Sequence, residues 1–202
     1  MINGQLKICG VTNKNVINAI KSIKRSIFVP EKYKNSAYIE TSIPLSEKQQ
    51  MLTPLTIGKI LQALNIQKNH TILQIGSGSG YLAAVLSKLG KKVDVIEYYQ
   101  SLTKLSQDNL KKSNIKNVKI STEDASCGIK STATYDIIII TASMPRLIER
   151  YLENLKTEGK IIAVLGESPS MKVTLLKKLE HKKCIRSILF ETDVLKIIDK
   201  IK

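Results

Sequence analysis

Three glycines alternate with serines near the middle of the chain, in the order Gly76-Ser77-Gly78-Ser79-Gly80. Residues 72–75 before them, apolar except for Gln74, are typical of a buried strand, and the apolar residues within 82–89 are spaced as on a helix. Glycine adopts positive φ angles and lets the backbone approach a ligand, while the free amides that open a helix attract negative charge. The sequence therefore predicts a strand, a ligand-binding turn and a helix.

Two carboxylates follow at the ends of the next two predicted strands. Glu97 ends the strand predicted over 92–97, and Asp124 lies in the turn after the strand predicted over 118–121. Open α/β sheets bind ligands at the carboxyl ends of their strands, where the glycine turn also lies. There Glu97 is placed to accept hydrogen bonds from both hydroxyls of a ribose, and Asp124 from the exocyclic amine of adenine. Together these features predict a pocket for S-adenosylmethionine.

Other interpretations of the same residues are weaker. A dinucleotide-binding turn usually has its third glycine at the sixth position of G-x-G-x-x-G, where this chain has Tyr81 and places Gly80 one residue early. Taken singly, the glycine turn could serve only tight packing, and Glu97 and Asp124 could be solvated loop residues or helix caps. Their positions at successive strand ends favour the ligand site.

The elements that must position these residues alternate from residue 71 onward. Strands are predicted over 71–75, 92–97, 118–121, 135–141 and 160–165, with helices between them, including one over 146–155. The unbroken isoleucines 137–140 are typical of a central strand buried on both faces. Segments 172–179 and 184–190 predict a closing antiparallel hairpin. The expected fold class is therefore α/β: a doubly wound, mostly parallel seven-stranded sheet.

The first seventy residues are expected to be helical and rich in loops. Thr12 can cap a helix over 13–23, and Thr53 before Pro54 is the preferred N-cap followed by the preferred first helical residue. We expect one domain over 1–202, with a helical N-terminal segment, 1–70, that covers the pocket of an α/β core, 71–202.

Composition limits the partners and the compartment. The net charge of +15 comes mostly from scattered lysines, whereas readers of nucleic acid usually cluster arginines, so the sequence argues against a nucleic-acid partner. No apolar run approaches the roughly 20 residues of a membrane helix, and the N-terminus lacks the apolar core of a secretion signal. Cys9, Cys127 and Cys184 form neither a disulfide framework nor a metal-spaced cluster. A cytoplasmic protein without a metal site is expected.

The chain also resembles a known family, the protein-L-isoaspartate O-methyltransferases, over nearly its whole length. The residues that carry the resemblance are 28–30 (Phe-Val-Pro), 37–38, 43–45, 49–54, 76–86, 135–145 and 155–160. The opening residues 3–6 and 10–12 look more like a divergent bacterial branch of that family than like its main repair enzymes.

The resemblance implies a Rossmann-like methyltransferase that transfers the S-adenosylmethionine methyl group to a carboxylate of an isoaspartyl protein or peptide. It implies that the methyl donor is held by eight residues: Gly76, Ser77, Gly78, Gly80, Tyr81, Glu97, Asp124 and Ala125.

Two departures from the family pattern affect the acceptor and the donor. Family members present the substrate from a Gln-Thr-Ile-Ser loop; here Gln49 is followed by Gln50, Met51 and Leu52, so both hydroxyls are missing. Thr53, one position further, is the candidate catalytic hydroxyl, although an N-cap role competes with it. Gln74 stands where the family usually has an acidic residue. Two alternatives therefore stay open: methylation of a different acceptor, and a donor-binding module without catalysis.

Overall fold

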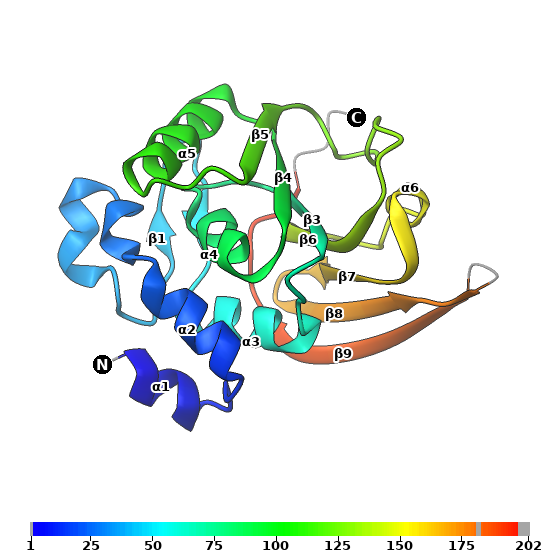
Figure 1. The fold of residues 1–202 in the computed structure, drawn as a ribbon, viewed down its shortest axis with the longest axis horizontal. Coiled ribbons are helices and arrows are strands. Elements are labelled where there is room, and N and C mark those ends of the chain that lie inside the picture. The colour runs from blue at the N-terminus through cyan, green and yellow to red at the C-terminus, as the bar shows by residue number, and fades with distance from the viewer. Residues whose placement is uncertain (1, 181–182, 198–202) are drawn as a thin grey trace.

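A seven-stranded mixed sheet forms the centre of the protein in a computed structural model that describes residues 2–180 and 183–197 (Figure 1). Its strands, in spatial order, are β5 (Val118–Thr122), β4 (Lys92–Glu97), β3 (Thr71–Ile75), β6 (Tyr135–Met144), β7 (Leu155–Glu167), β8 (Ser170–Lys178) and β9 (Cys184–Thr192). The strands from β5 to β7 are parallel, and β8 and β9 add antiparallel pairs. The predicted fold class is confirmed, although residues 181–182 of the hairpin link lie outside the described residues.

The strand order reverses beside β3, which places the glycine turn at a switch point of the sheet. β3 pairs with β4 on one side and with β6 on the other, and the helices α4 (Tyr81–Leu89) and α5 (Gln100–Lys112) connect β3 to β4 and β4 to β5. Residues 137–140 of β6 are buried between β3 and β7, as predicted for a central strand. The carboxyl ends of β3, β4 and β6 consequently surround one region.

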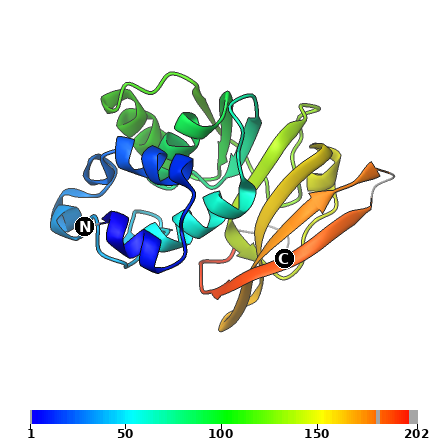
Figure 2. The same cartoon turned by 60° about the horizontal axis from the view of Figure 1, so that its bottom comes forward.

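The N-terminal residues form a separate group of short elements on one side of the sheet. They are α1 (Ile2–Ile8), α2 (Lys14–Ser22), the 3-10 helices η1 (Arg25–Ile27) and η2 (Glu31–Ser36), the two-residue strands β1 (Ile43–Pro44) and β2 (Gln50–Met51), and α3 (Pro54–Leu64). In Figure 2, α1 and α2 lie away from the long strands β7, β8 and β9, whereas α3 reaches the sheet, where Lys160 Nζ of β7 donates to the Leu64 carbonyl (2.9 Å). Its apolar side chains join those of α4 in one core.

The two faces of the sheet are covered unequally. Alternating residues such as Ile72, Val93 and Ile137 pack with α2, α3 and α4, whereas Leu73, Ile138 and Ile161 pack on the opposite face. That second face is covered mainly by Tyr151 of the short helix α6 (Arg150–Glu153) and by neighbouring loop residues. Among the described residues, no helix is both long and apolar enough to cross a membrane.

Two details of the predicted elements were wrong. The cap of α2 is Asn13, whose side chain accepts hydrogen bonds from the amides of Asn15 and Val16; the amide of Thr12 instead donates to Gln62 Oε1. The helix predicted over 146–155 is only α6, because β6 continues as a strand to Met144 and β7 already begins at Leu155. That the whole chain is one domain, divided near residue 70, stays a prediction.

A charged cluster fixes the start of the central strands. Asp136 Oδ2 accepts hydrogen bonds from the Thr71 amide (2.7 Å), the Thr71 hydroxyl (2.9 Å) and Lys156 Nζ (2.9 Å). Burial by itself would raise the pKa of Asp136, but these hydrogen bonds outweigh it and lower the pKa below its ordinary 3.8. The cluster therefore connects β3, β6 and β7 at the edge opposite the glycine turn.

Replacement of Asp136 by asparagine should reduce the free energy of unfolding at pH 7 by about 1 kcal/mol, because a partly exposed charged pair is lost. A lowered folded pKa stabilises the protein above the unfolded value near 3.8, and that contribution is lost as the pH falls through the folded pKa. Urea unfolding at pH 7 and pH 3 measures this. A difference between wild type and Asp136→Asn that grows on acidification would contradict it.

Candidate active site

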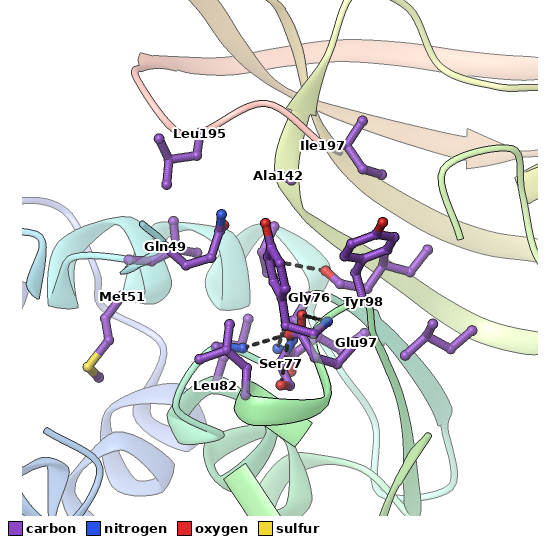
Figure 3. Close-up of a pocket in the computed structure, with 18 of the residues that line it drawn as sticks. Gln49, Met51, Gly76, Ser77, Leu82, Glu97, Tyr98, Ala142, Leu195 and Ile197 are labelled. Carbon is purple, nitrogen blue, oxygen red and sulfur yellow. Dashed lines mark hydrogen bonds between the residues drawn. The ribbon is translucent and has the colours of Figure 1, made fainter. Parts of the chain in front are cut away.

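A cavity of about 1040 Å³, counting the part open to solvent, lies at the carboxyl ends of β3, β4 and β6. Its walls come from the glycine turn, the end of β4, the loop after β5, residues 49–52 and the C-terminal residues 194–197. Figure 3 shows Gln49 and Met51 on one side, Leu195 and Ile197 across from the glycine turn, and Glu97 and Ser77 beside one another. Segments that are distant in sequence, with Arg25 and Thr141 among their residues, therefore form one site.

The glycine turn depends on two positions that a side chain would disrupt. Gly76 has φ +88°, and a Cβ there would collide with the Thr141 hydroxyl, which donates to the Ile75 carbonyl (2.9 Å). Gly80 has φ +86°, and its Cβ would lie 3.0 Å from Ser106 Cβ. These contacts hold the turn tightly between β6 and α5, so its shape depends on the absence of side chains.

Glu97 holds the same turn from the neighbouring strand. It is 5% exposed, and its Oε2 accepts hydrogen bonds from the Ser77 amide (2.7 Å), the Ser77 hydroxyl (2.9 Å) and the Gly78 amide (3.2 Å). Its Oε1 accepts from the Tyr99 amide (3.0 Å). Sequence reasoning expected only a ligand contact here; the structure shows that this carboxylate also orders the turn.

The other predicted donor-site residues also line the cavity, except Gly80. Asp124 Oδ1 accepts a hydrogen bond from the Ser126 amide (2.9 Å), which fixes the loop after β5, and the buried Ala125 follows it. Tyr81 is buried at the start of α4, and burial raises its pKa to about 12. Gly80 stands behind the turn against Ser106 and shapes it from there.

Gln74, a residue of the cavity wall, has a buried side-chain oxygen. The residue is 1% exposed, and its Nε2 donates to the Gly76 carbonyl (2.6 Å). The other polar atom of the side-chain amide is the acceptor Oε1. That Oε1 is buried without a hydrogen-bond partner in the described structure. A buried amide oxygen of this kind lowers the free energy of binding of a ligand that donates a hydrogen bond to it.

The structure places Thr53 at the N-cap of α3. Its hydroxyl oxygen accepts from the Thr56 amide (3.2 Å) and donates to the Thr56 hydroxyl (2.9 Å). Gln49, Gln50, Met51 and Leu52 line the cavity, and Thr53 does not. The N-cap role is confirmed, because the α3 amides need an acceptor at this position. The catalytic role of Thr53 stays a prediction.

Two parts of the wall were missed by sequence reasoning. Arg25, the first residue of η1, lines the cavity although it is 52 residues before Ser77 in the chain, a separation that hid it. Residues 194–197 cross the end of β6, where the Ser143 amide donates to the Leu195 carbonyl (2.9 Å) and the Ile197 amide donates to the Ser143 carbonyl (2.7 Å). The apolar Leu195 and Ile197 alone carried no signal in the sequence.

Comparison with known proteins identifies relatives over nearly the whole chain. A profile of the family Protein-L-isoaspartate(D-aspartate) O-methyltransferase (PCMT) matches residues 2–201. Proteins named protein-L-isoaspartate O-methyltransferase from Methanospirillum hungatei and Flavobacterium johnsoniae are each 34% identical to this chain; the alignments cover 86% and 85% of this chain and 81% and 80% of those proteins.

Solved structures show the same fold. A Plasmodium falciparum protein described as a protein-L-isoaspartate O-methyltransferase, crystallised with S-adenosyl-L-homocysteine, matches with a TM-score of 0.85 over 98% of this chain and 96% of its own, at 22% identity. With the family profile spanning the glycine turn, Glu97 and Asp124 alike, this chain belongs to the protein-L-isoaspartate(D-aspartate) O-methyltransferase family.

Proposed function

We propose that this protein transfers the methyl group of S-adenosylmethionine to the carboxylate of an L-isoaspartyl residue in a protein or peptide. The observation that supports this most strongly is the glycine turn that Glu97 orders in the wall of the cavity, in a chain of this family. The exposed thiols of Cys9 and Cys127 are consistent with a reducing compartment, and we propose the cytoplasm.

The residues of the cavity fit an adenosyl sulfonium compound. The positive φ of Gly76 and the close approach of Thr141 leave a turn that only glycine can form, so ligand and backbone can come near each other. Glu97 and Asp124 supply acceptors for ribose hydroxyls and for the adenine amine, and Ser77, Gly78, Tyr81 and Ala125 complete that wall. Gln74 Oε1 is a neutral acceptor for the ammonium group of the methionine part, which weakens this contact relative to the acidic residue that the family usually has there.

The proposed methyl transfer needs little acid or base catalysis from the protein. When bound, S-adenosylmethionine supplies a methyl group on a positively charged sulfur. A carboxylate oxygen forms a bond to that carbon while the carbon–sulfur bond breaks, and the electron pair stays on sulfur. Because a carboxylate is already ionised at neutral pH, the residues of this chain need only to align the acceptor and exclude water. Met51, Leu52, Leu195 and Ile197 are suited to excluding water.

The acceptor is tested with S-adenosylmethionine labelled on the methyl group. An isoaspartyl peptide and its normal aspartyl counterpart are incubated with the protein, and base-labile label is counted. Label on the isoaspartyl peptide alone is the expected result, because a methyl ester is hydrolysed by base. Tight binding of S-adenosylhomocysteine with label on neither peptide would contradict this acceptor and leave a different acceptor or a non-catalytic module.

A further inference from the structure

A buried positive charge lies in the wall of the cavity, outside the residues that the proposed donor site uses. Arg25 has 0% of its surface exposed and is the first residue of η1. Its guanidinium carbon lies 4.7 Å from the centre of the Tyr81 ring, and its Nη2 donates to the Leu52 carbonyl (2.8 Å). Arg25 therefore joins the start of α4 to residues 50–52, the segment where the family's hydroxyls are missing.

The hydrogen-bonding capacity of this guanidinium is only partly used. Nε and Nη1 are buried without a hydrogen-bond partner, and no carboxylate among the described residues lies within 4.0 Å of the guanidinium nitrogens. Burial lowers the pKa of Arg25, while Tyr81, Glu40 and Tyr38 favour its charged form. A buried arginine without an ion partner is costly unless a ligand supplies one.

The geometry of a guanidinium indicates the chemical class of the ligand that would pair with Arg25. Its planar fork of N–H groups matches the two oxygens of a carboxylate, and charge-assisted hydrogen bonds of this kind are among the stronger ones in proteins. The proposed reaction requires a carboxylate as the methyl acceptor, and residues 50–52 beside Arg25 carry no hydroxyl that could orient it. We propose that Arg25 binds the acceptor carboxylate through Nε and Nη1 and positions it for methylation.

This inference rests on the proposed function and deepens it. Because both N–H groups are covered in this structure, the acceptor must displace a neighbouring side chain of the wall before it pairs with Arg25. The methionine carboxylate of the donor is the competing source of a negative charge. We assign the acceptor, because Nη2 of Arg25 donates to the Leu52 carbonyl and so holds the guanidinium beside residues 50–52, while among the described residues its contact with the predicted donor wall is the Tyr81 ring alone.

The test compares two peptides that differ at one group. A fluorescent isoaspartyl peptide and its analogue with a carboxamide in place of the α-carboxylate are titrated by anisotropy in saturating S-adenosylhomocysteine, so that no methylation occurs. Wild type should bind the acid at least about 10-fold more tightly than the amide, the effect of one charge-assisted hydrogen bond. In Arg25→Met this ratio should fall to about one, and Arg25→Lys should keep part of it because the charge remains.

Controls separate binding from folding and from net charge. Arg186→Met removes the same charge from an exposed position on β9 and should leave the acid-to-amide ratio unchanged. S-adenosylhomocysteine affinity by calorimetry should fall much less in Arg25→Met than the acid-to-amide ratio does, because in the described structure Arg25 contacts the predicted donor wall only through the Tyr81 ring. Thermal unfolding reports whether each variant is folded.

Each outcome decides the inference. The inference is overturned if Arg25→Met binds both peptides more weakly by the same factor, or if it loses S-adenosylhomocysteine affinity instead. It is also overturned if wild type binds the acid and the amide equally, and this result holds even if neither Arg25 variant folds. If wild type methylates the isoaspartyl peptide but Arg25→Met keeps the full ratio, the role of Arg25 is wrong and the proposed function stands. If wild type methylates no isoaspartyl peptide, the proposed function fails first.

Discussion

Replacement of Gly76 by alanine should abolish measurable binding of S-adenosylhomocysteine, with an affinity loss of at least about 100-fold, which corresponds to about 2.7 kcal/mol. The residue has φ +88°, which costs an alanine about 1–2 kcal/mol, and the new Cβ would collide with the Thr141 hydroxyl. Either the turn or Thr141 must move, and both belong to the cavity wall. Calorimetry with S-adenosylhomocysteine and urea unfolding measure the two effects.

Gly10 offers a matched control for this change. It has φ +87°, but a Cβ there would meet no atom within 4 Å, and it does not line the cavity. Gly10→Ala therefore carries the same backbone strain and should lose stability without losing affinity. Adding Thr141→Ala to Gly76→Ala removes the colliding hydroxyl and should restore part of the binding. Unchanged affinity in Gly76→Ala alone would show that the turn does not shape the donor site.

Replacement of Glu97 by glutamine is expected to weaken S-adenosylhomocysteine binding about 10- to 100-fold, as for the loss of charged hydrogen bonds worth about 1.5–3 kcal/mol. The carboxylate accepts four hydrogen bonds, from the Ser77 amide and hydroxyl and from the amides of Gly78 and Tyr99. An amide has one oxygen, so its NH₂ group must face at least one of these donors. The turn loses its anchor at the same time as the proposed ribose acceptor is lost.

The control for Glu97→Gln is Glu191→Gln, the same chemical change at an exposed position on β9. It should leave both affinity and stability within experimental error. Urea unfolding should show that Glu97→Gln also loses roughly 2 kcal/mol of stability, since buried amides lose acceptors. A variant that loses stability but binds S-adenosylhomocysteine as wild type does would assign Glu97 to the turn alone and contradict its ligand role.

Local patterns in the sequence determined much of the fold. Apolar runs and turn residues report the strand and helix periods directly, which is why the seven strands and the Thr53 cap were predicted correctly. The helix over 146–155 was only partly correct: Arg150–Glu153 form α6, and the last predicted residue, Leu155, pairs with Tyr135 in the sheet instead. The sequence also located Gly76 and Glu97, since glycine spacing and strand-end carboxylates depend on nearby residues only.

Tertiary structure alone decided how those residues are used. Glu97 bonds the turn 19 and 20 residues earlier in the chain, Arg25 reaches Leu52 and Tyr81 from η1, and residues 194–197 close the far wall. None of these contacts has a sequence period, because each depends on segments that meet only when the sheet is assembled. The glycines and carboxylates therefore predict a donor site from the sequence, whereas the surroundings of the proposed acceptor arise from packing between distant segments.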